Sequence, residues 1–195
     1  RLTHQPLSFS VSETTEGVHI HIIDAELMGK GEKEKKDLYI EGVQNNGIIN
    51  HYEYIINSEG TIEIRHVLKP EGKMPLWFPR IGLTLTVSDA LDQVKWYGRG
   101  PQENYPDRKT GYPTGIYAST VQAMYEPYLM PQDYGLRTDV RWLQLTTDKG
   151  IGLQFKMNEW FNFNIYPYST DNLTKAMYTY QLQKQKGMTL NLDYA

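Results

Sequence analysis

The sequence contains no cysteine among its 195 residues, which excludes disulfides, thiol nucleophiles and thiolate metal sites. Its apolar runs are only a few residues long, far short of the ~18 to 20 that a membrane-spanning helix needs. A formal net charge of −3 provides no basic stripe for nucleic acid or for an anionic membrane surface. We therefore expect a soluble protein without nucleic-acid or membrane partners, and its compartment stays open between the cytoplasm and the periplasm of a bacterium.

Histidine is absent after residue 66, which restricts the possible chemistry. The sequence also lacks a G-x-S-x-G nucleophile elbow, a P-loop and a dinucleotide-binding fingerprint. His19 and His21 are two residues apart and therefore share one face of a predicted strand. Zinc-binding pairs use this spacing. Zinc usually takes at least three protein ligands, so we interpret this pair as solvent-facing strand residues and predict no metal site.

Aromatic residues are abundant, with fifteen tyrosines and four tryptophans. Aromatic side chains suit the pleated surface of a sheet, so this content favours an all-β protein. Stacking of the rings on sugars is the alternative interpretation, and composition does not decide between the two.

Period-two alternation predicts most of the secondary structure. It indicates a strand at 18–22 and a hairpin over 51–68, whose turn at 57–60 contains Gly60. We predict six further strands, at 81–87, 93–97, 140–146, 151–157, 161–166 and 188–194. A second turn is expected at 148–150, a solvated mixed-charge loop at 29–36, and one helix from Ser169 or Thr170 to Met177. No composition break divides the chain, so we predict a single all-β domain over residues 1–195, a sandwich or a barrel.

The segment GRGPQENYPDR, residues 98–108, concentrates backbone-restricting residues. Its glycines allow unusual backbone angles and its prolines fix φ, which predicts a loop with one shape. Arg99 or Arg108 is expected to pair with Glu103 or Asp107. Those two acids could also form a glycosidase pair, which needs carboxyls ~5 to 10 Å apart. We favour a rigid binding loop over a catalytic one.

Three runs of sequence carry a family resemblance: FPRIGLTLTV (78–87), VKWYGRGPQENYPDR (94–108) and MYEPYLMPQDYGLRTDVRWLQL (124–145). Together they resemble the C-terminal domain of family 2 glycoside hydrolase β-galactosidases, which has a PR-x-G strand, a W-x-G-x-GPQENYPDR segment and a Y-x-PY-x-x-P-x-x-x-G-x-R pattern. The resemblance implies an antiparallel supersandwich, related to the galactose mutarotase fold and truncated here at both ends. The stretch 109–123 departs from the best-known members.

The resemblance also implies what the chain does. In this family the two catalytic glutamates lie on a separate (β/α)8 barrel, and the parent enzyme hydrolyses terminal β-D-galactosides with retention. The resemblance therefore implies no catalytic residue and no activity in this chain, which would support the fold and lend a mobile loop to the rim of the galactose site. The rim residues by match are Gly100, Pro101, Gln102, Glu103, Asn104, Tyr105, Pro106, Asp107 and Arg108.

Other parts of the expected site follow from the same resemblance. Gly100 would be the hinge of the loop, and Trp96 and Tyr97 are candidate aromatic supports. No cofactor is expected in this chain, because the Mg²⁺ and Na⁺ that family members often use are bound mainly by other domains. The expected partners are those domains, above all the catalytic barrel, and the galactoside substrate through the site of the parent enzyme.

Two other functions remain as alternatives. The first is an independent carbohydrate-binding sandwich. The second is a mutarotase-like epimerase, whose chemistry needs a histidine and a carboxylate at the sugar. The absence of histidine after residue 66 makes that arrangement hard to build.

Overall fold

The computed structural model describes residues 2–28, 47–72 and 74–195 and divides the chain into two compact units, Arg1–Phe78 and Pro79–Ala195. Each unit is described by itself, and the single domain over 1–195 stays a prediction. The mixed-charge run at 29–36 lies outside the described residues. Among the residues that are described, no helix has the length and apolar character needed to cross a membrane.

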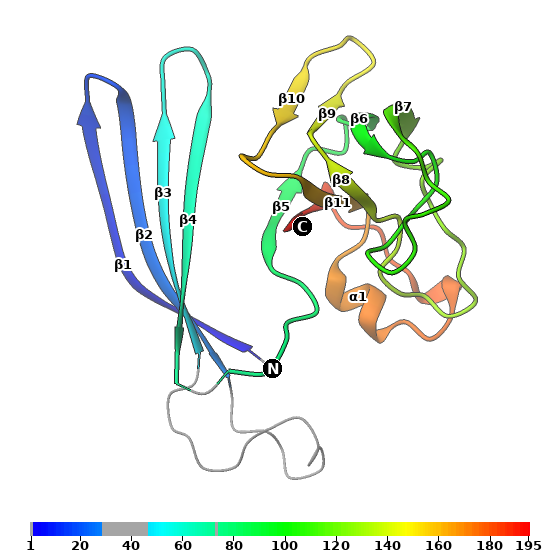
Figure 1. Cartoon of the computed structure of the whole chain (residues 1–195), viewed down its shortest axis with the longest axis horizontal. Helices are drawn as coiled ribbons and strands as arrows, with labels where there is room; N and C mark the ends of the chain where they lie inside the picture. Colours follow the sequence, from blue (N-terminus) through cyan, green and yellow to red (C-terminus); the bar gives the residue numbers. More distant parts are fainter. Residues whose placement is uncertain (1, 29–46, 73) are drawn as a thin grey trace. The chain divides into compact units, whose positions relative to one another are not determined.

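Unit 1 is one antiparallel sheet of four strands in sequence order (Figure 1). Its strands are β1 (Leu2–Thr14), β2 (Gly17–Met28), β3 (Gly47–Ile56) and β4 (Ile62–Glu71). The predicted hairpin is confirmed: Asn57 Oδ1 accepts hydrogen bonds from the backbone N–H groups of Glu59 (3.0 Å) and Thr61 (2.9 Å). Gly60 supplies the expected positive φ, at 82°.

The register of this sheet separates its two faces by chemistry. One row across the four strands pairs Phe9, Ile22, Tyr52 and His66, and the next row on that face pairs Val11, Ile20, Tyr54 and Ile64. The opposite face carries a polar row of Ser10, His21, Glu53 and Arg65. Because side chains alternate across a strand, His19 lies on this polar face beside His21.

Unit 2 is a β-sandwich of two four-stranded antiparallel sheets. One sheet has the order β10 (Gly152–Phe155), β9 (Trp142–Thr146), β6 (Gln93–Arg99) and β7 (Thr114–Thr120). The other has the order β5 (Gly82–Val87), β12 (Met188–Tyr194), β11 (Phe161–Tyr166) and β8 (Arg137–Val140). The prediction of an antiparallel all-β sandwich is confirmed.

The core of unit 2 lies between these sheets. Trp96 and Leu143 from one sheet pack with Phe161, Phe163 and Leu190 from the other, and each is at most 1 % exposed. Burying each such side chain contributes roughly 1.5 to 3 kcal/mol. This core fixes the end of β6, from which the segment 98–108 departs.

The strand predicted at 140–146 is confirmed as β9 but begins two residues later, because the chain changes sheets at Arg141. β8 ends at Val140 in one sheet and β9 begins at Trp142 in the other. Asp139 turns the backbone with φ 53°, and the Arg141 N–H donates to the Tyr97 carbonyl at 2.7 Å. Apolar residues occur on both sides of this corner, at Val140, Trp142 and Leu143, so the predicted strand was extended across it.

The predicted helix is confirmed but shorter, with α1 at Thr170–Lys175. Ser169 is its N-cap, and its Oγ accepts from the Asn172 N–H at 3.1 Å. A 3₁₀ turn, η1 (Thr179–Gln181), follows. The predicted turn at 148–150 is also confirmed, with Gly150 at φ 78°.

Candidate binding loop

The segment from Arg99 to Lys109, here called the 99–109 loop, is fastened to the chain that leads into β8. The Asn104 N–H donates to the Leu136 carbonyl at 2.8 Å. In return, Asn104 Oδ1 accepts from the backbone N–H of Thr138 at 3.0 Å and from its hydroxyl at 2.5 Å. Asn104 and Thr138 are both fully buried, so these bonds are made away from water, where a missing partner is costly.

Glu103 is the centre of a second set of contacts and is 6 % exposed. Its Oε2 accepts from the Gly135 N–H at 2.9 Å and from the Tyr105 hydroxyl at 3.2 Å. Its Oε1 accepts from Arg108 Nη2 at 3.0 Å and from the Tyr128 hydroxyl. Both carboxylate oxygens are therefore occupied by donors of the protein itself.

The pKa of Glu103 follows from these contacts. Burial opposes ionisation, but the hydrogen bonds from Tyr128, Gly135 and Arg108 outweigh it and hold the pKa below its usual value. An ionised carboxylate has no proton to donate, and one with four donors has little capacity to accept a proton from a substrate. Glu103 is thus suited to holding the loop, not to general acid–base catalysis.

Arg137 crosses beneath the loop and is 3 % exposed. Its Nε donates to the Pro101 carbonyl at 3.0 Å and its Nη1 to the Gly135 carbonyl at 2.9 Å. Its guanidinium lies 5.3 Å from the ring centre of Trp96, whose Nε1 donates to the Arg99 carbonyl at 3.0 Å. Burial lowers the pKa of Arg137 to about 10, so it keeps its charge at neutral pH.

Asp139 anchors both ends of the loop. It accepts from Arg99 Nε at 2.5 Å and from Lys109 Nζ at 2.7 Å. Burial of Asp139 is outweighed by these two hydrogen bonds, and its pKa is lowered. The expected pairing of an arginine with an acid of the loop is confirmed for Arg108 and Glu103, through one Nη2 contact rather than two. Arg99 pairs with Asp139 instead.

The remaining loop residues divide by exposure. Glu103, Asn104 and Gly100 are buried and Tyr105 is half-buried, whereas the exposed members are Pro101, Gln102, Pro106, Asp107 and Arg108. The loop therefore has an anchored inner side and an outer side that faces solvent. Of the two candidate aromatic supports, Trp96 is in the core and Tyr97 is 37 % exposed.

Gly100 owes its place to close packing. Its peptide bond to Pro101 is cis, and a Cβ at Gly100 would lie 2.8 Å from Tyr117 Cδ2 and 3.0 Å from Trp96 Cζ2. A larger residue would have to displace these rings. The mobility of the loop and the hinge role of Gly100 stay predictions.

Six residues of this site were not expected: Tyr128, Gly135, Arg137, Thr138, Lys109 and Asp139. The first three coincide with the Y-x-PY-x-x-P-x-x-x-G-x-R pattern at 125–137, which therefore contained the signal. Asp139 lies outside this pattern. Its ion pairs depend on the corner that the chain makes between β8 and β9, which the sequence does not indicate.

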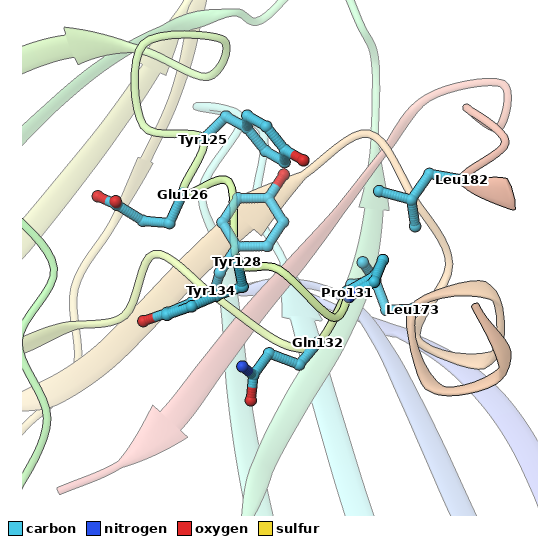
Figure 2. A pocket seen from close by; sticks show the side chains of 8 residues that line it. All are labelled: Tyr125, Glu126, Tyr128, Pro131, Gln132, Tyr134, Leu173 and Leu182. Carbon is cyan, nitrogen blue, oxygen red and sulfur yellow. The ribbon is translucent and has the colours of Figure 1, made fainter. Parts of the chain in front are cut away.

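A small pocket lies beside the loop, between the 125–134 segment and α1 (Figure 2). Leu173 and Leu182 stand on one side of it, opposite three tyrosines of that segment (Figure 2). The space between these side chains has no room for a water molecule and is far below the ~300 Å³ of typical ligand pockets. Glu126 is at its edge, where burial, together with the nearby charge of Glu103, raises the pKa of Glu126. We interpret the pocket as a packing gap behind the loop.

Comparison with known proteins places these features in a family. The family model described as beta galactosidase small chain matches residues 8–195. The beta-galactosidase of Priestia megaterium is 38 % identical over 141 residues, which cover 72 % of this chain and 14 % of that protein. The beta-galactosidase of Vibrio cholerae is 39 % identical over 115 residues, covering 59 % of this chain and 10 % of that protein. The beta-galactosidase of Psychromonas ingrahamii is 33 % identical over 147 residues, which cover 75 % of this chain and 13 % of that protein. The chain thus spans between 10 and 14 % of the length of these relatives.

Proposed function

The chain belongs to the beta galactosidase small chain family, and from this premise we propose that it works as a non-catalytic part of a family 2 β-galactosidase. In this proposal it is the C-terminal, mutarotase-like supersandwich of an enzyme that hydrolyses terminal β-D-galactosides with retention. The catalytic barrel of that enzyme is its principal partner. The great length of the relatives compared with this chain supports this assignment.

Within that enzyme, we propose that the 99–109 loop forms part of the rim of the galactose site. The observation that carries this proposal is the division of the loop into an anchored side, at Glu103 and Asn104, and an exposed side. Exposed polar groups on a fixed backbone can meet a ligand with little loss of conformational entropy. Gln102 and Asp107 offer an amide and a carboxylate, which suit the hydroxyl groups of a sugar.

The contacts of Glu103 give the loop a specific task in this proposal. An ionised Glu103 holds Tyr105, Arg108, Tyr128 and the Gly135 backbone together, so the outer residues are positioned by a network that takes no part in proton transfer. The catalytic acid and nucleophile are then supplied by another domain, and this chain orients groups at the edge of the site.

Kinetics of the β-galactosidase that contains this chain test the rim assignment. We expect Gln102→Ala and Asp107→Asn to raise KM for o-nitrophenyl β-D-galactoside several-fold while the enzyme stays folded. The matched control is Asp148→Asn, which alters an equally exposed acid in the β9–β10 turn. Unchanged KM and kcat in both loop variants would contradict the rim assignment.

The isolated chain tests the non-catalytic assignment separately. We expect it to leave o-nitrophenyl β-D-galactoside intact at enzyme concentrations where the parent enzyme is active. Hydrolysis by the purified chain, lost in Glu103→Gln but not in Asp148→Asn, would place the chemistry in the loop and overturn this proposal.

An independent sugar-binding surface is a second candidate, favoured by one cluster of aromatic residues. The Arg141 guanidinium lies 4.0 Å from the ring centre of Trp160 and 5.2 Å from that of Tyr97. Trp160 is 54 % exposed and offers a ring on which a pyranose could stack. Calorimetry of the chain with galactose and lactose, compared with Trp160→Ala, tests it. Absence of heat at millimolar sugar would exclude this function.

A further inference from the structure

The polar face of unit 1 brings three metal-ligating side chains together. His19 and His21 alternate along β2, and the register pairs His21 with Glu53 on β3. One ligand atom from each of His19, His21 and Glu53 lies within 4.8 Å of the other two. The sequence shows the two histidines but not their neighbour, because Glu53 is on a separate strand.

The distances between these atoms are close to those of a metal site. Glu53 Oε1 lies 3.6 Å from His19 Nδ1 and 3.9 Å from His21 Nε2. Ligand atoms around a tetrahedral zinc ion, each ~2.0 to 2.2 Å from the metal, are roughly 3.3 to 3.5 Å apart. The two separations from Glu53 therefore exceed those around a zinc ion by roughly half an ångström or less.

Direct hydrogen bonding does not account for this arrangement. Both separations from Glu53 exceed the ~3.2 Å limit of ordinary N–H···O hydrogen bonds. The other ring nitrogen of His19, Nε2, is buried and has no hydrogen-bond partner. When the proton of His19 is on Nε2, the Nδ1 lone pair is directed toward Glu53 and is available to a cation.

A neighbouring arginine fixes the carboxylate. Arg65 Nη1 donates to Glu53 Oε2 at 3.1 Å, which leaves Oε1 directed toward the two histidines. Arg65 Nε also donates to Glu63 Oε1 at 2.8 Å, so the charge of Glu63 offsets that of the arginine. Partners of this kind orient metal ligands in known sites.

We propose that His19, His21 and Glu53 bind a divalent cation of the zinc class. Two imidazoles and one carboxylate are a donor set that zinc accepts with water in the fourth position, whereas Ca²⁺ and Mg²⁺ prefer oxygen ligands alone. The side chain of His21 is 50 % exposed, which gives the ion and its water a path to solvent. The bound ion would join β2 to β3, and the site is independent of the 99–109 loop and of the proposed function.

Titration of the chelator-treated chain with zinc chloride tests this proposal. Calorimetry is expected to show one zinc ion per chain, and magnesium chloride is expected to give no heat. His21→Gln and Glu53→Gln should each weaken zinc binding at least ~10-fold. The control is His4→Gln, which removes one of the five histidines from the same sheet but lies outside the cluster.

Circular dichroism of each variant checks that the sheet persists, and the half-exposed side chain of His21 should be replaced without loss of the fold. Absence of zinc binding by the unaltered chain would overturn the proposal whatever the variants do. Equal affinity in the unaltered chain and in a folded His21→Gln variant would overturn it as well. A visible absorption band of tetrahedral Co²⁺ that disappears in Glu53→Gln would support the carboxylate as a ligand.

Discussion

The carboxylate of Glu103 accepts a hydrogen bond from the backbone N–H of Gly135 at 2.9 Å, which joins the 99–109 loop to the chain that enters β8. Gly135 has φ 76°, a conformation that glycine adopts without strain, and this turn directs its N–H toward the loop. A charged acceptor on one segment and a backbone donor on the other form a bond stronger than a neutral one. The shape of the loop thus depends on a residue outside it.

Removal of this carboxylate should destabilise unit 2. Glu103→Ala leaves the Gly135 N–H and two tyrosine hydroxyls without their acceptor, and we expect a loss of about 2 to 4 kcal/mol in the free energy of unfolding. Glu103→Gln keeps the size and some of the bonds, so its loss should be smaller. Urea unfolding measures both. The control Asp107→Asn changes the exposed acid of the loop and should stay within about 0.5 kcal/mol, and an equal loss there would contradict the assignment.

Low pH should remove the contribution of ionised Glu103 to the free energy of unfolding. The folded pKa of Glu103 is lowered, so its ionised form stabilises the chain above the ordinary value of 4.5, and this stabilisation is lost as the pH falls through the folded pKa. The difference in unfolding free energy between the unaltered chain and Glu103→Gln should therefore be full at pH 7 and shrink below about pH 4. Urea titrations between pH 3 and 7 measure it. A difference independent of pH would show that the charge of Glu103 does not stabilise the fold.

Replacement of Asn104 should lower the free energy of unfolding as much as replacement of Glu103. Asn104→Ala removes the acceptor of both the Thr138 N–H and its hydroxyl in a fully buried place, and we expect a cost of about 2 to 4 kcal/mol. Thr138→Val removes only the hydroxyl bond and should cost about 1 kcal/mol. Hydrogen exchange of the Thr138 amide checks the mechanism. It should accelerate in Asn104→Ala, and unchanged protection would mean that another group holds this amide.

The sequence predicted the strands of the core better than those at the edges. β11 and β12 were predicted at their observed bounds, because they are central strands with dense apolar residues. β7 was missed. It is an edge strand with few apolar residues, so its sequence lacks a clear alternation of apolar and polar positions. β1 was also missed, although Leu7, Phe9 and Val11 alternate there with serines; Pro6 and the register shift beside it interrupt that pattern.

The site was predictable only in part, for a similar reason. A fixed shape of the segment 98–108 was expected from its own residues, and the pairing of Arg108 with Glu103 joins residues close in sequence. The contacts that decide the role of Glu103 come from Tyr128 and Gly135, and those of Asp139 come from a corner between two sheets. Contacts between distant segments depend on how the sheets pack, which local patterns do not contain.

A methyl group at Gly100 should separate a packing role from a conformational one. Gly100→Ala places a Cβ 2.8 Å from Tyr117 and 3.0 Å from Trp96, and we expect a loss of about 1 to 3 kcal/mol as the rings shift. The matched control is Gly111→Ala, because a Cβ at Gly111 meets nothing within 4 Å; it should be neutral or slightly stabilising. Thermal unfolding of both variants measures the difference. Tyr117→Leu should recover part of the loss in the Gly100→Ala background if the tyrosine ring causes it, and no recovery would indicate that the backbone at Gly100, not the ring contact, requires glycine.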